Sequence, residues 1–360
     1  MNIHNLLGSP QFSEKLKTLV SKHFTAGHKC SRSVEVQEEF PILLSPENAH
    51  RNFFLEENGD IIATASWAPF EFHYNNSAIT CAGIGLIVTS PDHRRKGLAS
   101  KLIEYCENDA RQKACSVAVL WSSLHEFYMR RGYMVAGSEL QWKVPKSKLL
   151  LINMQQRVQA LKNYSEISKI YENAAIGPKR NETRYQKFMN LPDTFAFKTD
   201  RSYVLMGKAR DLHDVIHEIN GLVDETPALL KSCAEKCEGQ DIFIQLPSQS
   251  PFAPSITQIA GTPNRGAFAL FKLLNGPSFV EKLVRASQIP NDVEFLITPK
   301  SFSIKHKTQN LFESEDFGHF MQLFMGPIDV DDFEDIPKSL KETLRKIKVP
   351  PLYFWGFDSV

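Results

Sequence analysis

A basic turn between a predicted buried strand and a predicted amphipathic helix carries the clearest chemistry in this sequence. The strand is expected at residues 83–89, the turn holds the basic residues 94–96 followed by Gly97, and the helix begins near Leu98. Free N–H groups at the start of a helix, together with the helix dipole, favour a bound anion. Gly97 has no Cβ, so an anion could approach its backbone closely. The stretch therefore predicts a pyrophosphate-binding loop.

A second chemical element follows another predicted buried strand, at residues 116–121. Residues 122–133 are expected to form a short helix that contains Phe127 and Tyr128 and leads into the next strand. The reference pKa of a phenol, about 10, is close to the value of about 8.5 for a thiol. Tyr128 is therefore a candidate proton donor. The alternative interpretation is a core aromatic that packs beside Phe127.

Taken in this order, the two elements resemble the Gcn5-related N-acetyltransferases (GNAT). The family's coenzyme A loop has the pattern Arg/Gln-x-x-Gly-x-Gly/Ala, which Arg94, Gly97 and Ala99 match. The resemblance implies that acetyl-CoA lies in a cleft between two diverging strands, with Tyr128 beside the coenzyme sulfur. The simpler alternative for the loop is a solvated basic turn that caps a helix.

The resemblance implies a set of acetyl-CoA-binding residues along the strand end and the loop. The backbones of Ile87 and Thr89 are expected to pair with the pantetheine amides, and a bulge near Val88 to expose an N–H group for the oxyanion. Residues 94–100 are expected to hold the pyrophosphate. The full set is Ile87, Val88, Thr89, Arg94, Arg95, Lys96, Gly97, Leu98, Ala99 and Ser100.

The elements that position these residues predict an α+β fold, with helices packed on a mixed α/β sheet. One complete catalytic GNAT domain is expected at residues 1–148. Besides the elements above, it has a helix at residues 12–24, a hairpin at residues 53–67 around an Asn-Gly turn, and a closing strand around residues 139–143.

A degenerate GNAT-like domain is predicted at residues 149–275, because its hairpin, strands and helix repeat the order of the first domain. The loop after its strand at residues 215–219 contains Asp224 and Glu225 and lacks the basic pattern, so it would repel a pyrophosphate. Residues 276–360 remain for a short C-terminal module that ends in an aromatic tail. The tandem arrangement resembles the enhanced-intracellular-survival (Eis-like) acetyltransferases.

The general base has several candidates. In the family that the chain resembles, the C-terminal carboxylate enters the active site of the first domain, which indicates Val360 as a catalytic residue here. An aromatic plug that closes the C-terminal module is the alternative role for this tail. His125 and Glu126 are weaker candidates, because on a short helix either side chain could simply face solvent.

The acceptor-binding residues are expected on the strand edge where acceptors approach in this fold. Trp67, Phe70 and Phe72 lie there, although one face of such a strand is core by default. The acidic run at residues 329–335 could attract a cationic amine, and a solvated loop is its alternative reading.

Composition argues against several classes of protein. The 360 residues include 42 Lys and Arg against 41 Asp and Glu, so nothing favours binding to nucleic acid or to a membrane. No apolar run approaches the ~20 residues that span a bilayer, and the N-terminus lacks the layout of a signal peptide. The six scattered cysteines are typical of reduced core thiols. We therefore expect a cytoplasmic protein.

No metal site is expected. His213 and His217 have helical spacing, but their segment is better interpreted as a strand, and Cys233 and Cys237 fall on an apolar stripe. Asp329 begins a run like a calcium loop but lacks the ligands and the glycine that should follow.

The function expected from the sequence is an N-acetyltransferase that moves an acetyl group from acetyl-CoA to a primary amine of a small molecule or peptide. The oligomeric state, including a homo-oligomer, stays open. The alternatives are an acyl-CoA sensor without catalysis and a lipid carrier that uses the C-terminal module.

Overall fold

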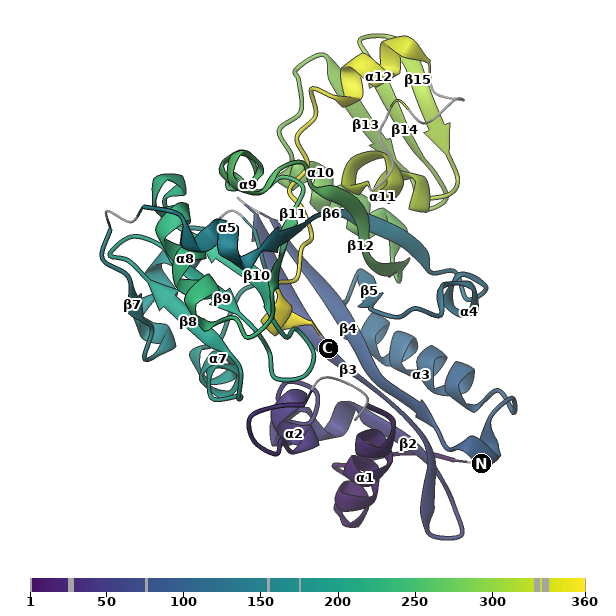
Figure 1. Ribbon diagram of the computed structural model, residues 1–360. Coiled ribbons are helices and arrows are strands. Elements are labelled where there is room, and N and C mark those ends of the chain that lie inside the picture. The colour runs from purple at the N-terminus through teal and green to yellow at the C-terminus, as the bar shows by residue number, and fades with distance from the viewer. Residues whose placement is uncertain are drawn as a thin grey trace.

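The computed structural model describes residues 2–24, 29–74, 77–153, 156–174, 176–326, 331 and 337–359. In these residues one 12-stranded sheet has the order β1-β2-β3-β4-β5-β12-β6-β11-β10-β9-β8-β7, and a three-stranded sheet has the order β13-β14-β15 (Figure 1). The strands of the large sheet are β1 Ile3–Asn5, β2 Asn52–Glu57, β3 Asp60–Tyr74, β4 Ser77–Thr89, β5 Val117–Leu120, β6 Met134–Pro145, β7 Gln159–Ala160, β8 Phe195–Lys198, β9 Tyr203–Met206, β10 Val215–Asn220, β11 Asp241–Pro247 and β12 Asn264–Leu273. The mixed α/β architecture expected from the sequence is confirmed.

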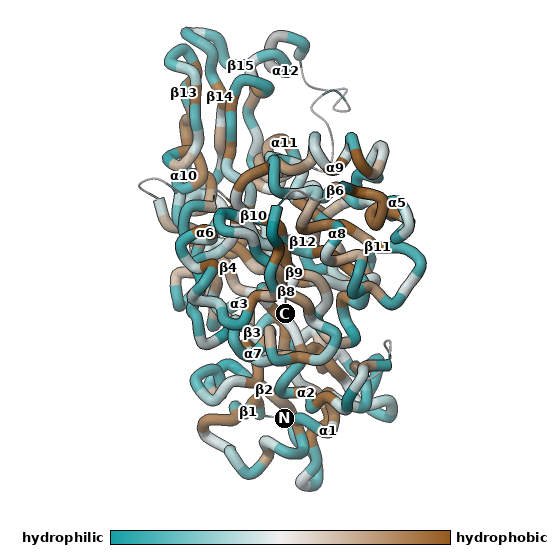
Figure 2. The backbone as a smooth tube through the Cα atoms, turned by 60° about the vertical axis from the view of Figure 1, so that its left-hand side comes forward, coloured by the Kyte–Doolittle hydropathy of each residue, from teal (hydrophilic) through white to brown (hydrophobic). Residues whose placement is uncertain are grey.

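Helices cover both faces of the large sheet. They are α1 Ser13–Phe24, α2 Val36–Glu39, α3 Leu98–Gln112, α4 His125–Met129, α5 Lys146–Leu150, α6 Ser168–Glu172, α7 Glu182–Met189, α8 Thr226–Lys236 and α9 Ala253–Ala260. Neighbouring residues of β2 serve opposite faces, as strand alternation requires: Phe53 packs with Leu102 of α3, and Phe54 packs with Leu16 of α1. The first half therefore has two core layers. Figure 2 shows hydrophobic segments along the middle of the molecule and mostly hydrophilic outer loops.

Strands β4 and β5 diverge in the first half. They are parallel neighbours from Cys81↔Val117 to Gly83↔Val119, after which β4 continues to Thr89 while Leu120 of β5 pairs with β12. Strand β4 also bulges against β3, because the three steps from Gly85 to Val88 oppose only two steps on β3, from Ser66 to Thr64. Leu86 in this bulge has φ +52°. The divergence leaves one edge of β4 without a parallel partner beyond Gly83.

The second half repeats this plan. Strand β10 is antiparallel to β9 and parallel to β11, and its register with β9 shifts between Ile216 and Glu218, which places a bulge at His217. The parallel pairing with β11 covers Val215 and Ile216, and β10 then continues to Asn220. Helix α8 follows β10 as α3 follows β4. The repeat of element order expected from the sequence is therefore present.

Strand β12 crosses from one half to the other. The predicted boundaries at residues 148 and 275 assign it to the second domain, yet it pairs with β5 through Leu270↔Leu120 and with β6 through Leu270↔Val135. It therefore lies between two strands of the first half, in the order β5-β12-β6. The domain boundaries remain predictions, and the two halves share one sheet.

The C-terminal region forms a small separate layer and then returns to the centre. Helix α10 Gly276–Ala286, strands β13 Val293–Ile297, β14 Phe302–His306 and β15 Gln309–Ser314, and helices α11 Gly318–Met325 and α12 Lys338–Leu344 make up this layer. In Figure 1 the yellow chain leaves it and ends near the middle of the molecule, between the two halves. Helix α11 contributes the buried Phe320 and Met321 to the core of this layer.

Candidate active site

The basic turn lies exposed at the start of α3, where the sequence predicts it. Arg94, Arg95 and Lys96 are exposed, and Gly97 is the N-cap residue of α3 with φ +77°. A Cβ built on Gly97 meets nothing within 4 Å, so the space in front of its backbone is open. Left-handed backbone without a steric neighbour is the conformation that suits an anion site at a helix start.

A cavity of about 880 Å³ lies beside this turn. Its lining includes Ser100 of α3, Ser123 after β5, and Phe127 and Arg131 around α4. Arg131 donates from Nε to Ser100 Oγ at 3.1 Å, and its guanidinium lies 3.6 Å from the centre of the Phe127 ring. The cavity thus joins the helix start to the α4 segment and offers a further cation. The sequence reasoning missed Arg131, although it stands in the quoted motif.

Tyr128 lies buried next to the divergence of β4 and β5. Its ring packs against Phe127 at 4.9 Å and against Tyr133 at 5.6 Å between centroids, and 5% of it is exposed. Burial raises the pKa of its phenol, while a hydrogen bond with Ser122 and the charge of Arg131 act in the opposite direction. Tyr128 is therefore protonated at neutral pH and available as a proton donor.

A second cavity, of about 690 Å³, lies between the two halves. Its wall includes Trp121 at the end of β5, Phe268 of β12, and Tyr353 and Phe354 of the C-terminal tail. These rings contact one another, with Trp121 at 5.5 Å from Phe354 and Phe268 at 4.4 Å from Tyr353. Trp121 lines this cavity and Ser123 lines the 880 Å³ cavity, so two positions of one short segment each line a different cavity.

The charged residues of the 690 Å³ cavity are mostly paired. Arg210 donates from Nε to Glu39 at 2.8 Å, and Lys208 lies 3.7 Å from Asp211. The Glu139 carboxylate instead accepts from two neutral donors, Gln141 Nε2 at 2.8 Å and Tyr353 Oη at 2.7 Å.

Burial raises the pKa of Glu139 above its ordinary value, and the two hydrogen bonds lower it in part. A bound cation would favour the charged form of this carboxyl group.

His217 also lines this cavity and is neutral. Its Nε2 donates to the Gly207 carbonyl at 3.0 Å, which leaves Nδ1 as an acceptor; this buried atom has no hydrogen-bond partner among the described residues. Burial, together with the charges of Lys208 and Arg180, lowers the pKa of His217 to about 3, although the hydrogen bond to Gly207 acts in the opposite direction. It does not titrate near neutral pH.

Comparison with known proteins identifies the first of these regions. Residues 17–136 match the family model described as an acetyltransferase (GNAT) domain. The N-terminal part of this chain is a GNAT domain. The matched segment contains the basic turn, Tyr128 and both diverging strands. No curated protein sequence matches this chain.

Solved structures extend the likeness in fold to the whole chain. A probable N-acyltransferase of unknown function from Enterococcus faecalis has a TM-score of 0.70 at 13% identity, with 98% of this chain and 99% of that chain covered. A GCN5-related N-acetyltransferase from Anabaena variabilis has a TM-score of 0.69 at 12% identity, covering 98% and 99%. Eis1 from Mycobacterium abscessus has a TM-score of 0.65 at 14% identity, with both chains covered completely. The fold is therefore shared over nearly the whole chain.

Of the predicted acceptor residues, Trp67 does not reach a cavity. It is fully buried under α3, where its Nε1 donates to Asp109 at 2.9 Å and its ring contacts the Arg51 guanidinium at 4.7 Å. The prediction for Trp67 is therefore wrong, because on β3 this side chain points to the α3 face rather than toward the other half.

Phe70 and Phe72 lie on the opposite face of β3 and are also buried. They pack against Phe354 with ring centroids 5.2 and 4.9 Å apart, so they support a wall of the 690 Å³ cavity from behind. Phe70 and Phe72 do not line this cavity, so they are placed to support its wall rather than to contact an acceptor as predicted. The aromatic wall itself comes from Trp121, Phe268 and Phe354.

The remaining predicted residues have simpler outcomes. His125 and Glu126 are exposed on α4 and line the 880 Å³ cavity of the GNAT domain. Val360 and most of the acidic run at residues 329–335 lie outside the described residues. Ile87 and Thr89 are partly exposed, whereas the side chain of Val88 is buried. The bulge falls at residues 86–87, just before the predicted Val88.

The part of the chain that the structure describes offers neither a cluster of metal ligands nor a helix that could cross a membrane. It contains no group of three His, Cys, Asp or Glu side chains placed to hold a metal ion. None of its helices combines the length and the apolar character needed to cross a bilayer. Cys233 and Cys237 are free and buried, as the sequence predicts.

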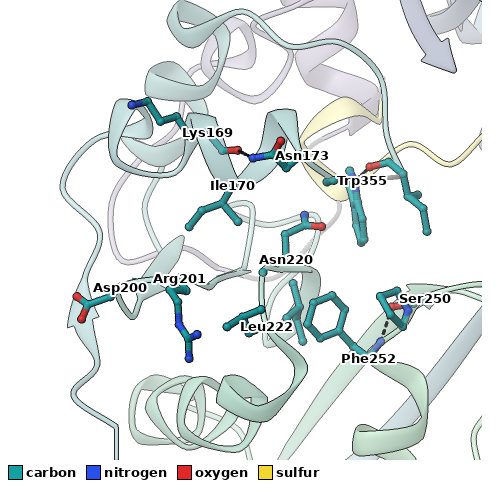
Figure 3. A pocket seen from close by; sticks show the side chains of 15 residues that line it. Lys169, Ile170, Asn173, Asp200, Arg201, Asn220, Leu222, Ser250, Phe252 and Trp355 are labelled. Carbon is teal, nitrogen blue, oxygen red and sulfur yellow. Dashed lines mark hydrogen bonds between the residues drawn. The ribbon is translucent and has the colours of Figure 1, made fainter. Parts of the chain in front are cut away.

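The second half has a cavity at the position that corresponds to the coenzyme cleft of the GNAT domain. This cavity, of about 550 Å³, is lined by the end of β10 at Asn220, the following Gly221 and Leu222, and Phe252 after β11 (Figure 3). Phe252 follows β11 as Ser123 follows β5. Trp355 of the tail closes one side of it.

Proposed function

We propose that this protein is an acetyl-CoA-dependent N-acetyltransferase that acetylates a primary amine in the cavity between its two halves. The observation that carries the proposal is the segment Trp121–Ser123, which contributes Ser123 to the cavity beside the start of α3 and Trp121 to the cavity between the two halves. Tyr128 of α4 follows this segment in the chain; burial raises the pKa of its phenol, and a hydrogen bond with Ser122 acts to lower it. The donor would bind in the first cavity and the acceptor in the second, with this phenol near the point where they meet.

The donor would bind along the route from β4 to α3. The unpaired edge of β4 after Gly83 suits the amides of a pantetheine arm, which would replace the missing strand partner. Residues 94–100 would surround the pyrophosphate with the exposed cations and the free N–H groups of the α3 start. Arg131, which already orients Ser100, would add a charge at the same cavity.

In the reaction, the amine nitrogen attacks the thioester carbonyl carbon and the carbon–sulfur bond breaks. A backbone N–H at the bulge of β4, at Leu86–Val88, would stabilise the negative charge on the carbonyl oxygen. Tyr128 would give its proton to the departing thiolate, so that free coenzyme A leaves. The amine would lose one proton to a general base.

We keep Val360 as the proposed general base, through a terminal carboxylate. Its neighbour Ser359 lines the 690 Å³ cavity, and Lys208 Nζ donates to the Ser359 carbonyl at 3.1 Å. His217 is a poor base because its pKa is far below neutral. Glu139 suits a different role: a carboxylate bonded only to neutral donors can attract the ammonium form of the acceptor.

The decisive experiment measures amine-dependent release of thiol from acetyl-CoA. Purified protein is incubated with acetyl-CoA and a panel of alkylamines, arylalkylamines, polyamines, aminoglycosides and short peptides, while free thiol is recorded. We expect release that depends on both substrates. Tight binding of coenzyme A in calorimetry without amine-dependent thiol release would support an acyl-CoA sensor instead and contradict the enzyme.

A further inference from the structure

The C-terminal segment at residues 353–359 passes from one half to the other. Tyr353 and Phe354 belong to the aromatic wall of the 690 Å³ cavity, next to Trp121 of the first half. From Trp355 onward the segment is buried against the second half, with Phe357 stacked on Phe188 of α7 at 5.0 Å. One short segment thus forms part of the acceptor cavity and is anchored elsewhere.

The anchor is the cleft of the second half. Strands β10 and β11 diverge after Ile216, and Gly356 lies against the bulge at His217, where a Cβ would come within 2.5 Å of the His217 ring. Trp355 reaches the 550 Å³ cavity at the end of β10, as Figure 3 shows, and its Nε1 donates to the Ile176 carbonyl at 3.1 Å. In the GNAT domain, the corresponding bulge faces the proposed thioester site.

Buried charges fix the end of this segment. Arg180 donates to both carboxylate oxygens of Glu218 on β10, at 2.7 and 2.6 Å, and to Asp358 at 2.9 Å. Its side chain is 1% exposed, and its guanidinium lies between the rings of Tyr171 and Tyr185 at 3.6 and 4.0 Å. Bidentate pairing and ring stacking fix a guanidinium in direction as well as in place.

Further donors complete the recognition of the segment. Tyr185 Oη donates to the second oxygen of Asp358 at 2.6 Å. Lys208 Nζ donates to the carbonyls of Gly356 at 3.2 Å and of Ser359 at 3.1 Å. The segment is therefore held at its side-chain carboxylate and at its backbone, much as a peptide ligand is held in a receptor cleft.

We propose that the coenzyme-type cleft of the second half has become the receptor for the chain's own residues 353–359, with Arg180 as the positioning residue that holds Asp358 and thereby sets the wall of the acceptor cavity. The consequence for catalysis rests on the proposed function, whereas the anchoring does not. Arg180 thus forms ion pairs with Asp358 of the C-terminal segment and with Glu218 of β10. The second half acts on the acceptor through the tail.

The test is Asp358→Asn in the full-length chain. In this variant the buried charge of Arg180 is still balanced by Glu218, so we expect the protein to fold. Hydrogen exchange followed by mass spectrometry should show faster exchange in residues 353–359 and unchanged exchange in α3. Asp292→Asn, which alters an exposed carboxylate paired with His306 in the C-terminal layer, is the matched control and should leave both segments unchanged.

Kinetics separate positioning from general loss of structure. For Asp358→Asn we expect the KM of the acceptor to rise or kcat to fall by a combined factor of about 10 or more, while the Kd of acetyl-CoA stays within about twofold. Arg180→Lys keeps the charge but loses the fork, and should show the same pattern to a smaller degree. Asp358→Glu, which restores the carboxylate, should recover part of the acceptor kinetics.

The outcomes distinguish this inference from the proposed function. Unchanged exchange in residues 353–359 of Asp358→Asn would overturn the anchor whether or not the protein is an enzyme. Faster exchange in the tail with unaltered acceptor kinetics would overturn the link to the acceptor cavity. If the wild-type protein transfers no acetyl group at all, the proposed function fails, and the exchange result still decides the anchor.

Discussion

In the first half, the loop from β4 to α3 carries the exposed Arg94, Arg95 and Lys96, and Ser100 in the first turn of α3 lines a cavity of about 880 Å³. In the second half, the loop from β10 to α8 carries Asp224 and Glu225, and the adjoining cavity is closed on one side by Trp355. The strands, the bulge and the following helix are the same in both. The comparison shows that this arrangement of strands and helix can form a binding cleft in either half. The charge of the loop, and whether the C-terminal segment occupies the cleft, then determine what can bind there.

Glu225 of the acidic loop already has hydrogen-bond and ion-pair partners within the second half. Glu225 is buried and accepts from Thr199, and Arg201 donates to it at 3.3 Å. Arg201, which lines the adjoining cavity, is therefore directed to a carboxylate of this loop. An incoming pyrophosphate would meet a filled site and a negative charge.

The largest effect that the comparison predicts comes from reversing charge in the first loop. The double variant Arg94→Glu, Arg95→Glu should weaken acetyl-CoA binding about 100-fold or more, because two phosphate-facing cations become anions. Isothermal titration calorimetry measures the change. The matched variant Asp224→Lys in the second loop should leave the affinity as it is; a gain of a second coenzyme site there would contradict the view that the second cleft is closed.

A smaller effect is expected from the phenol of the first cleft. Tyr128→Phe should lower kcat by at least about tenfold with little change in the Kd of acetyl-CoA, since it removes a proton donor and keeps the packing. Tyr133→Phe is the control, because this buried tyrosine packs 5.6 Å from Tyr128. Equal turnover in Tyr128→Phe and the wild type would reduce Tyr128 to a packing residue.

We expect His217, in the cleft of the second half, to make the protein less stable at acidic pH. His217 has a folded pKa of about 3 and an unfolded value near 6.5, so between these values only the unfolded chain takes up a proton here. Its contribution to stability is complete above pH 6.5 and falls by about 1.4 kcal/mol per pH unit below it. Urea unfolding at pH 7, 6 and 5 measures this loss.

His217→Gln should flatten this pH dependence, while the exposed His125→Gln should keep it. Parallel curves for His217→Gln and the wild type would show that other groups cause the acid loss.

The smallest predicted effect concerns the glycine of the first loop. Gly97→Ala should weaken acetyl-CoA binding by about fivefold, because the added Cβ projects into the open space and left-handed backbone costs about 1 kcal/mol for an L residue. Gly261→Ala is matched, with φ +96° and open space but a position after α9. Equal losses of affinity in both variants would mean that strain alone, and not contact with the ligand, is responsible.

Much of the first cleft could be predicted from the sequence because its signals are local. A helix start, a basic turn and an Asn-Gly hairpin depend on neighbouring residues, and α1, α3 and the β2–β3 hairpin lie where the pattern places them. The effect of the acidic loop after β10 could also be predicted, because negative charge at the start of a helix disfavours anion binding in any fold. Gly97 and Tyr128 could be assigned to the site for the same reason.

The rest depended on contacts between distant parts of the chain. Alternation along β3 shows that Trp67 and Phe70 differ in surroundings, but not which face meets α3. Arg180 gives no sign in the sequence that it binds both Glu218 and Asp358, 178 residues away from the latter. The position of β12 was likewise hidden, because a strand pattern reveals its own period and not its neighbours.

That position of β12 has a consequence for biosynthesis. The ribosome releases β5 and β6 long before Leu273, so the acetyltransferase half waits with two unmatched strand edges until the second half has been made. Exposed edges are where chains associate wrongly, and pairings between remote segments form slowly. We therefore expect nascent chains that stop before residue 264 to depend on chaperones, and the two halves to gain their final structure together.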